Sequence, residues 1–332
     1  MSLALSTVEI LSPDLVPTEE AAIQWRRLKA NTLSELVGLN SGLLTVTGLI
    51  GFLRQVLKVM NVVRPPKSAF EAREEDIAHD AYFCISRTEG DNIAILVHMA
   101  IRARLILAEE FIDPTLSLPN ASWQGIERSI IDLLGVLLDD NLASAIATAP
   151  ETSTARFVSS QHRWIRGHQI FAILTQGLLF SLRSLAQSIR TGDTKATMRH
   201  ADLSVSLLRG SREAFLFTGD FAPEDYMKII RPSMMPPVVP VSLSGLMSID
   251  HRYLVQLFRE MRPSLKQLRD HSPAQHDALF LEFSKVYDAH IHVCENFVGK
   301  LPSIRTANST EKSGPELLQN FRTLRLKPFE HN

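Results

Sequence analysis

One segment near the end of the chain places a histidine and a cysteine at a spacing that could do chemistry. Between residues 274 and 299 the apolar residues recur at three- and four-residue steps, which predicts a helix with one buried face. His290 and Cys294 fall on that face one turn apart, with their Cβ atoms about 6 Å apart. Such an imidazole could ligate haem iron while the thiol forms a thioether with a porphyrin vinyl group. The alternative is a core histidine beside an inert core cysteine.

The chain has 11 histidines, and two more of them lie at the start of apolar helical stripes. His168 begins a long stripe, where a pocket could open, although a histidine that only fills the core fits the same pattern. His251 follows Asp250 in the first turn of a predicted helix and shares a face with apolar residues. His162 and His292 are expected at the surface. Because imidazole ligates metals and moves protons near neutral pH, these positions are the candidate functional residues.

Several common sites have no signature in this sequence. There is no His-Glu-x-x-His and no Cys-x-x-Cys pair, so zinc has no recognisable ligand set. Neither a phosphate-binding loop nor a Gly-x-Ser-x-Gly nucleophile elbow occurs. These absences leave the histidines as the main source of chemistry.

Composition narrows the class of protein further. Lys and Arg number 35 against 36 Asp and Glu, and this balance argues against a partner such as nucleic acid or an anionic membrane. Two cysteines cannot form a disulfide framework, which fits a reducing cytoplasm. The most apolar run, residues 43–59, contains Arg54 and Lys58 and is too short to span a bilayer. We therefore expect a cytoplasmic protein.

Helical periodicity dominates the chain and predicts an all-α fold. We expect one helical domain over 1–332, with N-terminal helices over 1–150 that cover the pocket, a core over 151–300 and a tail over 301–332. Residues 231–240 contain four prolines and are expected to form an extended, pocket-lining loop without a helix. A surface loop is expected after Leu301. The predicted helices are 20–37, 43–61, 70–87, 91–111, 123–148, 158–190, 195–216, 223–230, 248–270, 274–299 and 315–324.

The order of these segments resembles that of the tryptophan 2,3-dioxygenases. Arg166-Gly-His168-Gln169 is followed by an apolar helix, then by Gly192-Asp193, Thr218-Gly-Asp-Phe221 and Arg231-Pro-Ser. In that family a Thr-His-Gln helix supplies the distal histidine, and a later histidine before an Ile-Gly supplies the proximal ligand. Here Ala289-His290 through Gly299-Lys300 is similar to the proximal segment. The glycine-rich loop that follows in the dioxygenases is replaced by Leu301-Pro-Ser.

A tyrosine-hydroxylating branch of this superfamily is more similar still. It contains the 3-methyl-L-tyrosine peroxygenases of saframycin-type antibiotic pathways, and its mark is a histidine, about 38 residues, then His-x-x-x-Cys. His251 and His290-Ile-His-Val-Cys294 reproduce that spacing. The resemblance implies a helical fold like that of the tryptophan and indoleamine 2,3-dioxygenases. It also implies an enzyme of histidine-ligated haem that hydroxylates a tyrosine derivative with hydrogen peroxide.

The same resemblance implies a role for each candidate residue. His290 would be the proximal ligand, Cys294 the single covalent tether of one haem per chain, and His251 a second axial ligand or a switchable one. Because iron with two histidine ligands has no open position for peroxide, one ligand must leave, or His251 is close to the iron without always being bound. His168 would be an acid or base in the pocket. Three residues beside the proline-rich loop are candidates to hold the substrate carboxylate, on position and chemistry alone: Tyr226, Lys228 and Arg231.

Other functions stay open from the sequence. The chain could use O2 as a haem dioxygenase or hydroxylase of an aromatic amino acid, which turnover of the ferric protein by peroxide alone would distinguish. It could also be a non-catalytic haem sensor or electron carrier with two histidine ligands, or a helical scaffold without haem. An aromatic amino acid and peroxide are the expected partners of the enzyme, and a homodimer is a candidate assembly.

Overall fold

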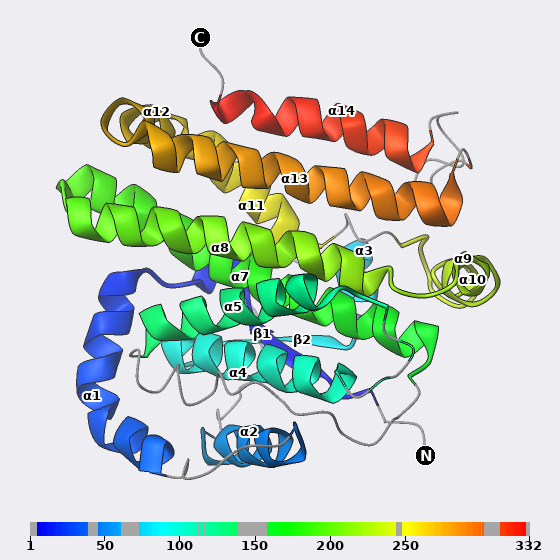
Figure 1. Cartoon of the computed structure of the whole chain (residues 1–332), viewed down its shortest axis with the longest axis horizontal. Coiled ribbons are helices and arrows are strands. Elements are labelled where there is room, and N and C mark those ends of the chain that lie inside the picture. The colour runs from blue at the N-terminus through cyan, green and yellow to red at the C-terminus, as the bar shows by residue number, and fades with distance from the viewer. Residues whose placement is uncertain are drawn as a thin grey trace.

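The fold comes from a computed structural model of the chain (Figure 1), which describes residues 5–38, 46–60, 73–111, 113, 115, 117–138, 158–243, 248–299, 301 and 313–329. The expected loop after Leu301 and the second part of the predicted helix 123–148 lie largely outside these residues. The elements in chain order are β1 (Val8–Leu11), η1 (Pro13–Leu15), α1 (Glu19–Gly38), α2 (Val46–Met60), α3 (Glu74–Tyr82), β2 (Ile85–Thr88), α4 (Asn92–Glu110), α5 (Asn120–Leu137), α7 (Ser160–Thr191), α8 (Thr194–Thr218), α9 (Pro223–Asp225), the π-helix η2 (Tyr226–Ile230), α10 (Arg231–Ser233), α11 (Ile249–Glu260), α12 (Arg262–His271), α13 (Pro273–Val298), α14 (Gly314–Leu326) and η4 (Lys327–Phe329).

Helix α7 is the central element of the fold. Most of its side chains are buried, polar ones included, and 83% of its most apolar stretch lies inside the protein, as in a core helix covered by neighbours. The Ser159 hydroxyl caps its first turn, and Gly192 ends it with a left-handed φ of 73° that favours glycine. Asp193 then caps the first turn of α8, so the two helices form a tight antiparallel hairpin.

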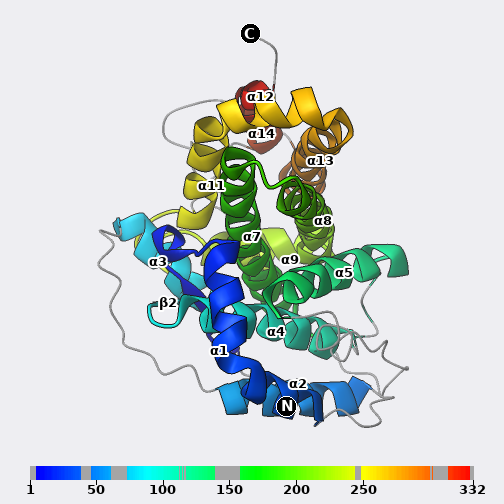
Figure 2. The ribbon, with the colours of Figure 1, turned by 90° about the vertical axis from the view of Figure 1, so that its left-hand side faces the viewer.

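The other helices pack on this hairpin in layers. Helix α13 lies along α8 and carries α14 on its outer side, whereas α4 and α5 cover the opposite side and α2 packs on α4 (Figure 1). Viewed from the side, α7 stands between α8 and α11 (Figure 2). Helices α7, α8, α11 and α13, which carry the predicted histidines or pack beside them, therefore meet around one interior region.

A two-stranded parallel ribbon, which the sequence did not predict, joins the N-terminus to residues 85–88. β1 pairs with β2 in the register Val8↔Ile85 to Leu11↔Thr88. Two glutamines of α7 bind backbone carbonyls of this region, since Gln169 donates to Phe83 O (3.1 Å) and Gln176 to Leu11 O (2.9 Å). The predicted helix 70–87 was therefore too long, because β2 begins at its end.

Two further predictions about helices were wrong. The predicted helix 248–270 is two helices, α11 and α12, because Pro263 lacks the N–H that a continuous helix needs and its ring crowds the preceding turn. The proline-rich stretch 231–240 begins with a helical turn, α10, which continues the π-helix η2. Pro232 is tolerated there because the first turn of a helix needs no donor.

His162 was also mispredicted. It is 6% exposed on α7, and its Nε2 accepts a hydrogen bond from Arg166 Nε at 3.0 Å. Its polar neighbours therefore belong to a buried charged cluster.

Candidate functional site

The α13 face predicted from the sequence lines two adjoining cavities. His290 belongs to both, and Phe171 and Phe215 also form the wall between them. His168, Cys294 and Tyr226 line the first cavity, and His251 and Tyr287 line the second. The remaining wall is mainly apolar: Trp164, Val293, Phe297 and Val298 in the first cavity, and Leu178, Leu208, Leu254, Phe283 and Val286 in the second. The structure thus brings His168, His251, His290 and Cys294 together.

The His290 ring lies in the wall that the two cavities share. It stacks on Phe215, with ring centroids 4.4 Å apart and planes 19° apart, and no described residue makes a hydrogen bond to it. Burial, together with the nearby Arg325 cation, lowers the pKa of His290 to about 4. The imidazole is therefore neutral at pH 7 and has a nitrogen lone pair available to a ligand.

His251 already has a partner in the second cavity. Its Nε2 accepts a hydrogen bond from Arg325 Nη1 at 2.7 Å, and the same Nη1 donates to the Tyr287 hydroxyl at 2.8 Å. Burial first, and then the Arg325 charge, holds the pKa of His251 well below its usual range. In this arrangement the Nε2 lone pair is directed at an arginine, so another donor or a metal can bind Nε2 only if that hydrogen bond breaks.

His168 is held in one tautomer by its own helix. Its Nδ1 lies 2.7 Å from Trp164 O, one turn earlier on α7, so Nδ1 carries the proton and donates to that carbonyl. Phe83 stacks on the ring at 4.0 Å and Trp164 packs against it at 4.4 Å. Burial lowers the pKa of His168 to about 3, so this imidazole is neutral at pH 7. Nε2 is left as an acceptor.

Cys294 lies one turn beyond His290 in the wall of the first cavity. It is a free cysteine, and burial, reinforced by the neighbouring Glu295, raises the pKa of its thiol to about 12. A protonated thiol is a weak nucleophile toward ordinary electrophiles.

The residues predicted to hold the substrate carboxylate separate into two groups. Tyr226 is buried in the first cavity with its ring parallel to that of Phe297 at 4.7 Å, and burial raises the pKa of its hydroxyl to about 12 while Arg231 opposes that rise. Arg231 thus lies near the Tyr226 hydroxyl at the edge of the site. The Lys228 side chain is exposed and is not part of either cavity wall.

Sequence reasoning missed site residues of two kinds, those with a signal in the local sequence and those without one. Trp164 has a local signal, since it precedes His168 by four residues and so shares its helical face. Arg325 and Phe215 have none, because they contact His251 and His290 from α14 and α8, elements distant in sequence. Arg325 in particular contacts a residue 74 positions away.

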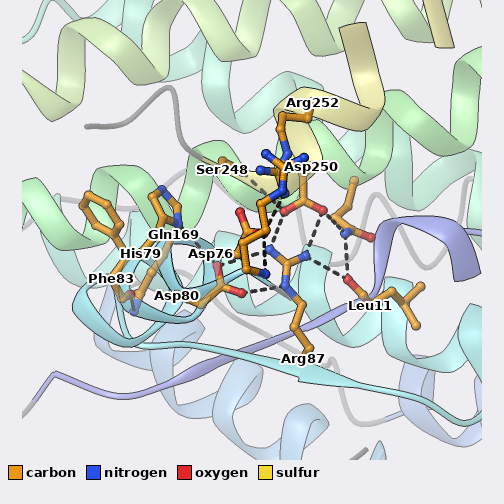
Figure 3. A network of polar contacts seen from close by, with 12 residues as sticks. Leu11, Asp76, His79, Asp80, Phe83, Arg87, Gln169, Ser248, Asp250 and Arg252 are labelled. Carbon is orange, nitrogen blue, oxygen red and sulfur yellow. Dashed lines mark hydrogen bonds and ion pairs between the residues drawn. The ribbon is translucent and has the colours of Figure 1, made fainter. Parts of the chain in front are cut away.

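A buried charge network fixes the helix that carries His251 (Figure 3). Arg87 of β2 bonds Asp250 through Nη1 at 2.9 Å and through Nη2 at 2.8 Å, and its Nε donates to Asp80 at 2.8 Å. Asp250 is fully buried in the first turn of α11, directly before His251. Arg252 of the same turn donates to Asp76 at 2.6 Å. The network therefore ties α11 to the α3–β2 segment.

Comparison with known proteins bears on this arrangement of residues. The family described as SfmD 3-methyl-L-tyrosine peroxygenase matches residues 9–275. A 3-methyl-L-tyrosine peroxygenase of Streptomyces lavendulae is 32% identical over 265 residues, which are 79% of this chain and 72% of that protein. The chain belongs to the 3-methyl-L-tyrosine peroxygenase family. It is thus an oxidoreductase of the peroxygenase type, as the sequence resemblance implied.

A solved structure of the family supports the fold as well. The crystal structure of reduced SfmD, obtained by soaking with sodium hydrosulfite, matches with a TM-score of 0.67 and 27% identity over 88% of this chain and 98% of that one. The predicted helical fold is confirmed. The family match ends at residue 275, before His290 and Cys294, so the assignment of these two residues depends on the geometry above.

Proposed function

We propose that this protein is a haem-dependent peroxygenase that uses hydrogen peroxide to hydroxylate the phenol ring of a tyrosine derivative. The reaction would convert 3-methyl-L-tyrosine to 3-hydroxy-5-methyl-L-tyrosine in tetrahydroisoquinoline antibiotic biosynthesis. The name of its curated relative supports this substrate and this chemistry. The observation that carries the haem assignment is the neutral His290 ring, which lacks a hydrogen-bond partner among the described residues and lies between two cavities, one turn from Cys294.

The donor set fits haem. Two neutral imidazoles, His290 and His251, line adjoining cavities, and imidazole is a common axial ligand of haem iron. The open space is about 70 Å³ in the first cavity and 30 Å³ in the second, less than a porphyrin occupies. Phe171 and Phe215, whose rings separate the cavities, would have to rotate to admit the macrocycle. The reduction of the solved relative with hydrosulfite supports a redox-active group in this family.

In this proposal His290 would hold the iron and Cys294 would form a single thioether to the haem. His251 would be a second ligand, once its hydrogen bond from Arg325 breaks and frees Nε2. When bound, haem supplies the iron at which the peroxide O–O bond is cleaved. The protein's own part is to hold the aromatic substrate against the apolar wall and to exclude water.

His168 is the proposed acid or base of the pocket. Because its Nδ1 proton is engaged by Trp164 O, Nε2 is the nitrogen that accepts a proton from peroxide or from the substrate phenol. A pKa of about 3 makes this imidazole a weak base. The peroxide or phenolate anion that forms when the proton moves would pair with the imidazolium, and this attraction would offset the cost of burying the charged ring. Tyr226 and Arg231 are proposed to contact the amino-acid part of the substrate. Lys228 remains a sequence prediction with no support from its exposed position.

The haem proposal is tested by spectroscopy and mass spectrometry of His290→Ala. Purified wild-type protein should show a haem absorption spectrum and a denatured mass larger by one haem. His290→Ala should lose most of this haem, whereas His292→Ala, on the exposed side of the same helix, should keep it. Full haem content in His290→Ala would give the proximal role to another residue. A bare-chain mass from coloured protein would remove the thioether to Cys294.

The role of His168 is tested by the rate of hydroxylation per haem. His168→Ala should keep haem and substrate binding but lose roughly 10²-fold or more in rate, the usual contribution of a positioned acid or base. His271→Ala is a matched control, because the Nδ1 of His271 also lies near the carbonyl four residues earlier (2.8 Å) but its side chain is exposed. A haem-normalised rate of His168→Ala within a few-fold of the control would refute the assignment.

The remaining predictions from the sequence concern organisation. A single haem-binding domain over 1–332, a cytoplasmic location and a homodimer stay predictions.

A further inference from the structure

A cleft with strongly basic walls is lined in part by Arg325, the residue that donates a hydrogen bond to His251. Four cationic side chains line it, Arg259, Arg262, Arg325 and Lys327, and we call it the basic cleft. Its open volume is about 330 Å³, several times the space in either inner cavity. Phe283 lines both the basic cleft and the His251 cavity, so only a thin wall separates the two.

The charge of the basic cleft is not balanced by its own walls. No acidic side chain is among the described residues that line it. Neither Arg259 nor Lys327 forms an ion pair or a side-chain hydrogen bond within the described part of the chain. Other arginines of this protein do have carboxylate partners, as Arg87 has Asp250 and Arg252 has Asp76. Because like charges repel when gathered in one hollow, an anion there lowers the free energy.

Arg325 connects the cleft to the proposed active site. Its Nη1 donates both to His251 Nε2 and to the Tyr287 hydroxyl, and neither acceptor carries a negative charge that would balance the guanidinium. Its Nε and Nη2 have no hydrogen-bond partner among the described residues. A guanidinium presents donors in a planar fork that matches a carboxylate with two parallel bonds.

We propose that the basic cleft is a binding site for a carboxylate group, held by Arg325 together with Arg259 and Lys327. Phe258 and Phe283 supply an apolar floor for the carbon part of the ligand. The carboxylate has two conceivable sources. One is a propionate arm of haem, and this source depends on the proposed function. The other is a small organic carboxylate from solution, which does not.

Binding in the cleft has a consequence for His251. A carboxylate that pairs with Arg325 competes for the guanidinium that now donates to His251 Nε2. Binding in the basic cleft therefore alters the hydrogen bonding of His251 in the second cavity.

The first experiment measures binding of benzoate to the purified protein by calorimetry, with benzamide as the neutral isostere. The variant Arg259→Ala/Lys327→Ala removes two exposed cations from the cleft and leaves Arg325 in place. The control variant Arg190→Ala/Lys195→Ala removes two exposed cations at the α7–α8 turn. If the source is free carboxylate, benzoate binds, benzamide does not, and the cleft variant weakens binding about tenfold or more. Equal benzoate affinity in the two variants would overturn the site.

The second experiment measures transfer of haem to apomyoglobin in a thioether-free Cys294→Ala background. If the source is a propionate, the holoprotein does not bind benzoate, but haem leaves the cleft variant about tenfold faster than the control variant. No benzoate binding together with equal haem loss would overturn the proposal. If the protein contains no haem, the proposed function is wrong. The benzoate measurement alone then decides whether the basic cleft binds a carboxylate.

Discussion

Replacing Arg87 with methionine tests how firmly the buried network holds the helix that carries His251. Arg87 is 13% exposed, and its partner Asp250 has no exposed side-chain surface. Methionine keeps most of the side-chain volume but leaves the carboxylates of Asp80 and Asp250 without their cation. Removing one partner of a buried ion pair typically costs about 3–5 kcal/mol, because the other charge stays desolvated. We expect a loss of that size in the free energy of unfolding of Arg87→Met.

Urea unfolding, followed by circular dichroism at pH 7, measures this loss. Arg54→Met is the matched control, since Arg54 also pairs with a carboxylate, Glu109, but its side chain is 58% exposed and Glu109 keeps a second arginine. Exposed pairs of this kind contribute about 0–1 kcal/mol. The double variant Arg87→Met/Asp250→Leu removes the more deeply buried of the two stranded charges and should be more stable than Arg87→Met alone. A loss in Arg87→Met no greater than in Arg54→Met would refute the reasoning.

The pH dependence of the same variant gives an independent check. Burial by itself would raise the pKa of Asp80, but its bonds to His79 and Arg87 outweigh this and lower it. A carboxyl with a lowered folded pKa stabilises the protein above its unfolded pKa, and this contribution is lost as the pH falls. The wild type should therefore lose more stability than Arg87→Met as the pH falls below 4, so the gap between them should narrow. A constant gap would mean that Asp80 does not depend on Arg87.

Three further predictions concern packing, a buried carboxyl and a helix cap. Gly167→Ala should destabilise the protein by about 1–3 kcal/mol in urea unfolding, because the new Cβ would lie 2.9 Å from Thr218 Cα. Gly51→Ala is the control, since a Cβ at Gly51 would meet open space, and it should stabilise the protein by up to about 1 kcal/mol. Burial raises the pKa of Glu110 to about 7, so the folded protein favours its neutral carboxyl. The stability that this carboxyl contributes is lost as the pH rises through 7, by about 3 kcal/mol in all. Glu110→Gln should abolish this pH dependence of the unfolding midpoint. Ser313→Ala removes the hydroxyl that caps α14 and should cost about 1 kcal/mol, with faster amide exchange in the first turn of that helix; unchanged exchange there would contradict the cap.

Features set by neighbours along one helix were predictable from the sequence. The three- and four-residue spacing on α13 placed His290 and Cys294 on one face, and both line the same cavity. The apolar stripe of α7 placed His168 at a pocket in the same way. Helical geometry fixes these relations locally, so no knowledge of the tertiary fold is needed.

Features set by pairs distant in sequence were not predictable. The ion pair of Arg87 with Asp250 joins residues 163 positions apart, and the β1–β2 ribbon pairs four-residue strands that are too short to show alternation. His162 has a polar local sequence, and only the arrival of Glu110 from α4 beside it shows that those polar residues are buried. The partner of each of these groups is determined by packing that no local pattern encodes.

The parallel ribbon also dictates the order in which this chain can assemble during synthesis. β1 leaves the ribosome early, but its pairing partner begins at Ile85, and the side chain that binds Leu11 O, Gln176, is made much later. β2 is translated well before α7, so the first strand can pair early but lacks its helix contact until α7 has been made. The ribbon therefore gains its full set of contacts only after α7 is made, and a ribosome-bound chain that ends before α7 leaves the ribbon without that helix cover.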